Sequence, residues 1–127
     1  GGPFRTRTGA ILGIGSPDGR QRAALAALYA ALVTDLCLDL VGARGQVIVE
    51  GRFARDEAYC AVLAALRRSQ EVLVSADETG TLAGAALLAR WPELGPAPEL
   101  RPVRLEPRIS QALHAHRARW RTRVAVD

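Results

Sequence analysis

The sequence contains no lysine, so arginine supplies all 17 of its basic residues. Together with the abundance of Ala and Gly, this choice indicates a compositional bias of the whole sequence, and the net charge of +4 therefore says little about binding partners. Aromatic residues are also scarce, at 5% of the chain, whereas hydrophobic residues make up 49% and are mostly Ala, Leu and Val. This composition is typical of helices packed on a small sheet, and it excludes an intrinsically disordered chain.

The chain has only two cysteines, Cys37 and Cys60, and neither has a second Cys or a His at the spacing of a metal site. A disulfide framework and a zinc site are therefore not indicated, and we expect two buried thiols in a reducing cytoplasm. The chain also lacks a basic segment followed by an apolar one at its start, and an apolar run of about 18 residues. We therefore expect a cytoplasmic location and no membrane contact.

Hydrophobic periodicity predicts strands and helices in alternation. A strand over residues 9–15 precedes a turn at Ser16-Pro17-Asp18-Gly19, and leucines at steps of three and four then predict a long helix that ends before Gly42. Further on, the pattern predicts strands at residues 46–49, 71–74 and 103–105, and helices at residues 56–68, 81–90 and 109–124. The alternation indicates an α/β fold, in which a small parallel or mixed sheet is flanked by helices. We expect one domain over residues 1–127, with a loop at residues 91–100 and a terminal strand and helix at residues 101–127.

Two segments carry a more specific pattern. The first is VIVEGRFARD, residues 47–56, in which a buried strand ends at a glycine turn, and the second is LVSADETGTLAGAALLA, residues 73–89. Together with the Pro-aromatic pair Pro3-Phe4 and the long helix, these segments resemble the closing half of the FGGY carbohydrate kinases. The resemblance implies part of a ribonuclease H-like lobe of the actin and hexokinase type. It also implies that the first lobe of such a kinase is absent from these 127 residues.

The resemblance implies that this chain is the ATP-side portion of an enzyme that transfers the γ-phosphate of ATP to a hydroxyl of a sugar or polyol. On this basis the residues expected at the adenosine are Gly51, Arg52, Asp56, Thr81 and Gly84. A glycine at the end of a strand suits a flat base, because no Cβ stands in its way and because nucleotides bind at the carboxyl ends of strands in open α/β sheets. The family usually has a small residue or Pro at Arg52 and Asn at Asp56.

The carboxylates Asp18, Asp35, Asp39, Asp77 and Glu78 do not match the family's acidic motifs, and we interpret them as helix caps or surface charge. No catalytic residue and no metal ligand is therefore assigned, and the Mg²⁺ that accompanies ATP in such kinases is expected to be bound by the absent part. The chain alone is expected to be inactive. Apolar surface left uncovered by the absent lobe predicts self-association into a homo-oligomer.

Three other interpretations remain open. A dinucleotide-binding module would explain Gly13, Gly15 and Gly19, but the last glycine is one position late for the GxGxxG fingerprint. An arginine-rich tail would suit a polyanion, yet no aromatic stacking platform accompanies it, so nucleic acid is not an expected partner. The arginines of this tail are Arg101, Arg104, Arg108, Arg117, Arg119, Arg121 and Arg123. A short paralogue that serves as an interaction subunit is the third interpretation.

Overall fold

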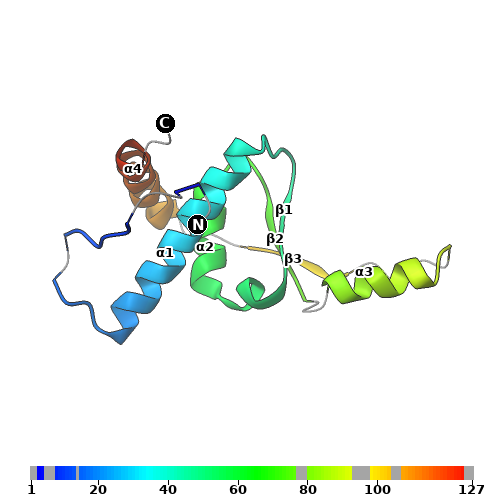
Figure 1. Ribbon diagram of the computed structural model, residues 1–127. Helices are drawn as coiled ribbons and strands as arrows, with labels where there is room; N and C mark the ends of the chain where they lie inside the picture. The colour runs from blue at the N-terminus through cyan, green and yellow to red at the C-terminus, as the bar shows by residue number, and fades with distance from the viewer. Residues whose placement is uncertain are drawn as a thin grey trace.

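A computed structural model describes residues 3–4, 8–13, 15–76, 80–92, 98–103 and 107–124 of the chain. Its elements follow the order α1 (Gly19–Leu40), β1 (Val47–Val49), η1 (Gly51–Arg55, a 3-10 helix), α2 (Glu57–Leu66), β2 (Val72–Ser75), α3 (Gly80–Ala89), β3 (Leu100–Pro102) and α4 (Pro107–Arg123). Figure 1 shows α1, α2 and α4 grouped at one end of the molecule and α3 projecting from the other. The α/β class expected from the sequence is confirmed.

Local chemistry fixes both ends of the long helix α1. At its start, the Asp18 carboxylate accepts a hydrogen bond from the Gln21 backbone N–H at 2.8 Å, and the Gln21 side chain accepts one from the Asp18 backbone N–H at 3.0 Å. This reciprocal arrangement is a capping box, which satisfies two backbone donors that a helix start leaves free. At its end, Gly42 has φ of +66°, a conformation that glycine adopts without the steric cost of a Cβ. The predicted helix is thus confirmed.

The three strands form one mixed sheet in the order β1-β2-β3. β1 and β2 run parallel, with Val47 opposite Val72 and Val49 opposite Val74, whereas β3 runs antiparallel to β2, with Ser75 opposite Leu100. The terminal strand was expected at residues 103–105 but forms at Leu100–Pro102 instead. The strand expected at residues 9–15 is wrong as well, because residues 8–13 are exposed and pair with no strand among the described residues.

The hydrophobic core lies around α2, which packs against α1, α4 and the sheet. Leu63 and Ala65 of α2 are fully buried, and so is Ala31 of α1. Alternation along β1 turns Val49 toward this core and leaves Ile48 48% exposed on the opposite face of the sheet. The face that carries Ile48 is therefore open at β1, whereas Leu73, opposite Ile48 on β2, is buried.

Helix α1 passes the length and composition test for a membrane-spanning segment, and it is the only described helix that does so. A core helix of a globular protein passes the same test. In this structure Ala31 and Leu32 of α1 are buried against the core, and Asp35 and Asp39 bind arginines from α2 and α4. These contacts identify α1 as a packed helix of the fold.

Candidate functional site

The turn that follows β1 is held by a glycine. Gly51 has φ of +67°, in the left-handed region that favours glycine, and a Cβ added there would meet nothing within 4 Å. Because β1 and β2 are parallel, their carboxyl ends reach the same edge of the sheet. The residue singled out by the sequence therefore lies at the edge where open α/β sheets bind ligands, and the space above it is open.

Asp56 caps helix α2, at the position where the sequence predicted that this helix begins. Its Oδ1 accepts a hydrogen bond from the Tyr59 backbone N–H at 3.0 Å, which satisfies one free donor of the first helical turn. The Asp56 side chain is exposed. Asp56 thus has a structural role at the start of α2, and its second carboxylate oxygen, Oδ2, takes no part in the cap.

An aromatic pair lies beside the Gly51 turn and was not singled out from the sequence. Phe53 of η1 and Tyr59 of α2 have ring centroids 4.7 Å apart, and Phe53 is 55% exposed. The Tyr59 hydroxyl donates to Thr34 Oγ1 at 3.1 Å, which fixes the inner ring while the outer ring faces solvent. Arg52 is exposed at the same turn. An aromatic residue two positions after a strand-end glycine was the signal available in the sequence.

The start of α3 comes close to the same turn through Glu50. A Cβ added at Gly80, the first residue of α3, would lie 2.9 Å from Cδ of Glu50. The two segments expected to form the site are therefore neighbours at their ends. Gly84, one helical turn further along, has nothing within 4 Å of an added Cβ, so the space beside it is open. The side chain of Thr81 lies outside the described residues.

Cys60 is buried under this turn and does not present a reactive thiol. Its Sγ lies 3.3 Å from the Phe53 carbonyl oxygen, to which it donates. Burial raises the pKa of the Cys60 thiol, and the nearby Asp56 and Glu57 carboxylates raise that pKa further. Since the thiolate is the nucleophilic form, Cys60 is held in its unreactive state. The described part of the chain also contains no group of three His, Cys, Asp or Glu residues that could hold a metal ion.

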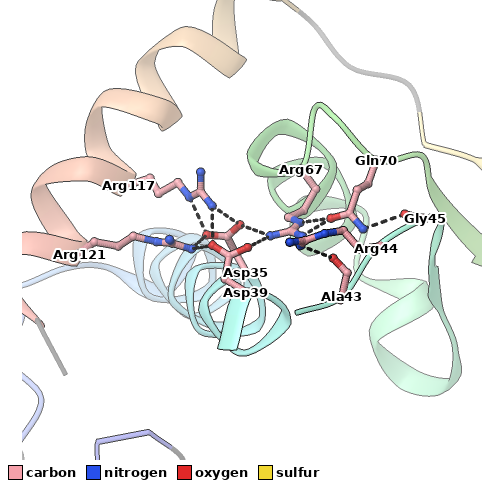
Figure 2. Close-up of polar contacts among 9 residues, drawn as sticks. All are labelled: Asp35, Asp39, Ala43, Arg44, Gly45, Arg67, Gln70, Arg117 and Arg121. Carbon is pink, nitrogen blue, oxygen red and sulfur yellow. Dashed lines mark hydrogen bonds and ion pairs between the residues drawn. The ribbon is translucent and has the colours of Figure 1, made fainter. Parts of the chain in front are cut away.

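A cluster of charges joins α1, α2 and α4, and Figure 2 shows its members converging from these elements. Asp35 is fully buried and accepts hydrogen bonds from Arg117 Nε at 2.7 Å and Arg121 Nη2 at 2.6 Å. Arg67, only 7% exposed at the end of α2, reaches Asp35 at 3.3 Å and also binds Asp39. Arg121 Nη2 lies 2.6 Å from Asp39 as well.

This cluster corrects two expectations from the sequence. Asp35 and Asp39 were interpreted as caps or surface charge, but Asp35 is a buried ion-pair centre. Arg117 and Arg121 were placed in a tail available to a polyanion, yet their guanidinium groups are bound to these carboxylates. Arg101 and Arg119 are exposed, whereas Arg104 and the side chain of Arg108 lie outside the described residues.

Comparisons with known proteins agree with the arrangement of these elements. The family model "Carbohydrate kinase FGGY, C-terminal domain" matches residues 1–98. A solved carbohydrate kinase from Novosphingobium aromaticivorans is 37% identical in sequence and superimposes with a TM-score of 0.66 over 87% of this chain. The chain spans only 23% of the length of that kinase. No curated protein matches the sequence. Since the family model covers more than half of the residues, the chain belongs to the FGGY carbohydrate kinases, in their C-terminal domain.

Proposed function

We propose that this chain forms the nucleotide-side portion of a kinase that transfers the γ-phosphate of ATP to a hydroxyl of a sugar or polyol. The observation that carries this proposal is the position of Gly51 at the carboxyl edge of the parallel strands in a member of this family. A nucleotide base approaching this edge would meet a glycine with open space above it. The exposed ring of Phe53 at the same turn offers a flat surface for stacking.

We further propose that the contact includes Gly51, Arg52, Asp56, Thr81 and Gly84. Arg52 is exposed at the turn, where its planar guanidinium is suited to stack on a base. Asp56 keeps one carboxylate oxygen for a ligand hydroxyl while the other caps α2. Gly80 places the amino end of α3, with its positive dipole, beside Glu50 at this edge.

Phosphoryl transfer also needs a base for the attacking hydroxyl and Mg²⁺ on the polyphosphate. The described residues offer no metal-binding cluster, so we assign neither role to this chain. We propose that the sugar site, the base and the Mg²⁺ ligands belong to other parts of a longer kinase, which works in the cytoplasm. The chain alone would then hold only adenosine, with a dissociation constant of about 1 mM, equivalent to about 4 kcal/mol.

An NMR titration of the chain with ATP tests the proposal. We expect saturable shifts at Gly51, Phe53 and Gly80, with none at Arg119 of α4. Gly51→Val should remove these shifts, because a branched Cβ would stand where the base approaches. Gly42→Val is the matched control: Gly42 has φ of +66° and equally open surroundings, so both variants carry the same backbone strain.

The outcome is decided by the difference between these two variants. If either valine variant fails to fold, Gly51→Ala and Gly42→Ala provide a milder pair, whose strain is about 1–2 kcal/mol. Shifts confined to the arginines of α4 would reject the nucleotide site in favour of polyanion binding. Sugar-dependent ATP turnover by the 127-residue chain alone would contradict the division of roles proposed above.

A further inference from the structure

A cavity of about 340 Å³ lies at the opposite end of the strands from the Gly51 turn. It is bounded by the end of α2, the start of β2, the end of β3 and the first turn of α4. Its apolar wall consists of Ala64, Val72, Pro102 and Val103. Its polar lining residues are Arg68, Gln70, Glu71 and Ser110.

Ser110 gives this cavity an unsatisfied hydrogen-bonding group. The residue is 2% exposed, and its buried hydroxyl has no hydrogen-bond partner among the residues that the structure describes. A buried hydroxyl with no partner is costly, and most buried polar groups in proteins are paired. Ser110 lines the cavity, and although its hydroxyl oxygen is buried as placed, rotation about the Cα–Cβ bond would turn it toward a ligand there. Ser110 also lies in the first turn of α4, at the positive end of the helix dipole.

The other polar residues of the wall differ in whether their side chains already have hydrogen-bond partners. Gln70 is engaged on both sides, since it accepts from Arg67 Nε at 2.6 Å and donates to the Gly45 carbonyl oxygen at 2.7 Å. Glu71 Oε2 accepts from Gln46 Nε2 at 2.8 Å. Arg68 is exposed and has no hydrogen bond or ion pair within the part of the chain that the structure describes. The polar side chains of this wall with no partner in the described ranges are thus those of Arg68 and Ser110.

We propose that this cavity binds a small organic monoanion, with its carboxylate toward Arg68 and Ser110 and its apolar body against Val72, Pro102 and Val103. A guanidinium, a hydroxyl and the amino end of a helix all favour a negative group. The cavity volume is in the range of small-molecule sites. Glu71 carries a negative charge in the same wall, which acts against dianions such as phosphate.

This site is separate from the proposed nucleotide contact. It lies at the amino end of β2, whereas Gly51 follows the carboxyl end of β1. Three of its lining residues, Pro102, Val103 and Ser110, come after residue 98, where the match to the family's C-terminal domain ends. A ligand held here would therefore depend on the part of the chain that this match does not include.

The test is an NMR titration of the 127-residue chain with benzoate, and with benzyl alcohol as a neutral analogue of similar shape. We expect saturable shifts at Arg68, Val103 and Ser110 with benzoate, and no shift at Gly51. Arg68→Gln should weaken benzoate binding about tenfold or more, since a charge-assisted hydrogen bond is lost. Arg119→Gln removes the same charge from an exposed position on α4 and should leave binding unchanged.

Ser110→Ala provides an independent arm that does not depend on charge. It should weaken benzoate binding without lowering the melting temperature of the free chain, because the hydroxyl loses no hydrogen bond to any described residue. Equal binding of benzyl alcohol and benzoate, tighter binding of inorganic phosphate, or the absence of saturable shifts would each overturn the proposal. So would an Arg119→Gln variant that weakens binding as much as Arg68→Gln, or a lowered melting temperature of Ser110→Ala.

Discussion

Substituting Asp35 tests whether the charge cluster holds the helices together. The Asp35 carboxylate is 0% exposed and is bound by three guanidinium groups, those of Arg67, Arg117 and Arg121. Asp35→Asn keeps the shape of the side chain but removes its charge. Arg67, which is 7% exposed, would then remain buried with its hydrogen bonds to Gln70, and Asp39 would be its one carboxylate partner among the described residues.

The size of the effect follows from burial. Removing one partner of a buried ion pair costs about 3–5 kcal/mol, because the remaining charge stays desolvated without compensation. Asp39 binds the same arginines, but its side chain is 36% exposed and water can replace part of the interaction. Asp39→Asn is therefore the matched control, with an expected cost of about 1 kcal/mol or less.

Urea unfolding followed by circular dichroism measures both free energies. We expect the midpoint of Asp35→Asn to fall well below that of Asp39→Asn, with an unchanged slope. If Asp35→Asn does not fold, Arg117→Gln and Arg121→Gln, singly and together, measure the coupling within the cluster from α4. Equal costs for the two aspartate variants, or strictly additive arginine variants, would refute the reasoning.

Two further predictions concern the pH dependence of stability and the exposed leucines of α3. Burial acts to raise the pKa of Asp39, but hydrogen bonds from Arg67 and Arg121 outweigh it and hold that pKa below its ordinary value of 3.8. The stability that Asp39 contributes is thus present above pH 3.8 and is lost as the pH falls through the lower pKa of the folded state. The urea midpoints of the parent chain and Asp39→Asn should therefore converge only in acid. A difference between the two midpoints that stays constant with pH would contradict this. Leu82 and Leu88 of α3 are 69% and 75% exposed, so changing both to Gln should reduce self-association measured by light scattering. Leu12 is 67% exposed but lies outside α3, and Leu12→Gln should leave self-association unchanged. A parent chain that is strictly monomeric at high concentration would contradict the premise.

Local signals allowed most helices to be predicted from the sequence. Asp18 and Gly42 bracket α1, and Asp56 caps α2, because capping chemistry depends on residues within one turn. Strand formation depends on pairing with segments distant in the chain, which local sequence patterns do not identify. Residues 9–13 have strand composition but pair with no strand in the part of the chain that the structure describes. β3 forms earlier than expected, where Ser75 lies opposite Leu100 and Pro102 ends an edge strand.

The charge cluster could be predicted from the sequence only in part. Asp35 and Asp39 are four residues apart, as are Arg117 and Arg121, so each pair lies on one face of its helix. Opposite charges at the same spacing on two helices were a visible sign of complementarity. What remained hidden was that α1 and α4 approach each other across 82 residues, and that Arg67 of α2 joins them in a buried position. Only the packing around α2 brings the three segments together.

The candidate nucleotide site was predicted in part for a similar reason. Gly51 could be placed at a strand end from sequence, but the proximity of Glu50 to Gly80 depends on parallel pairing of β1 with β2. Helices α1, α2 and α4 are grouped away from α3 (Figure 1), and the charge cluster joins them. Ile48 of β1, Phe53 of η1 and Leu88 of α3 are exposed. The incompletely covered surface is therefore the surface that carries the proposed adenosine contact. In a longer kinase, we expect the remaining chain to cover this side, and ATP affinity should rise above that of the isolated chain because the same packing would complete the nucleotide pocket.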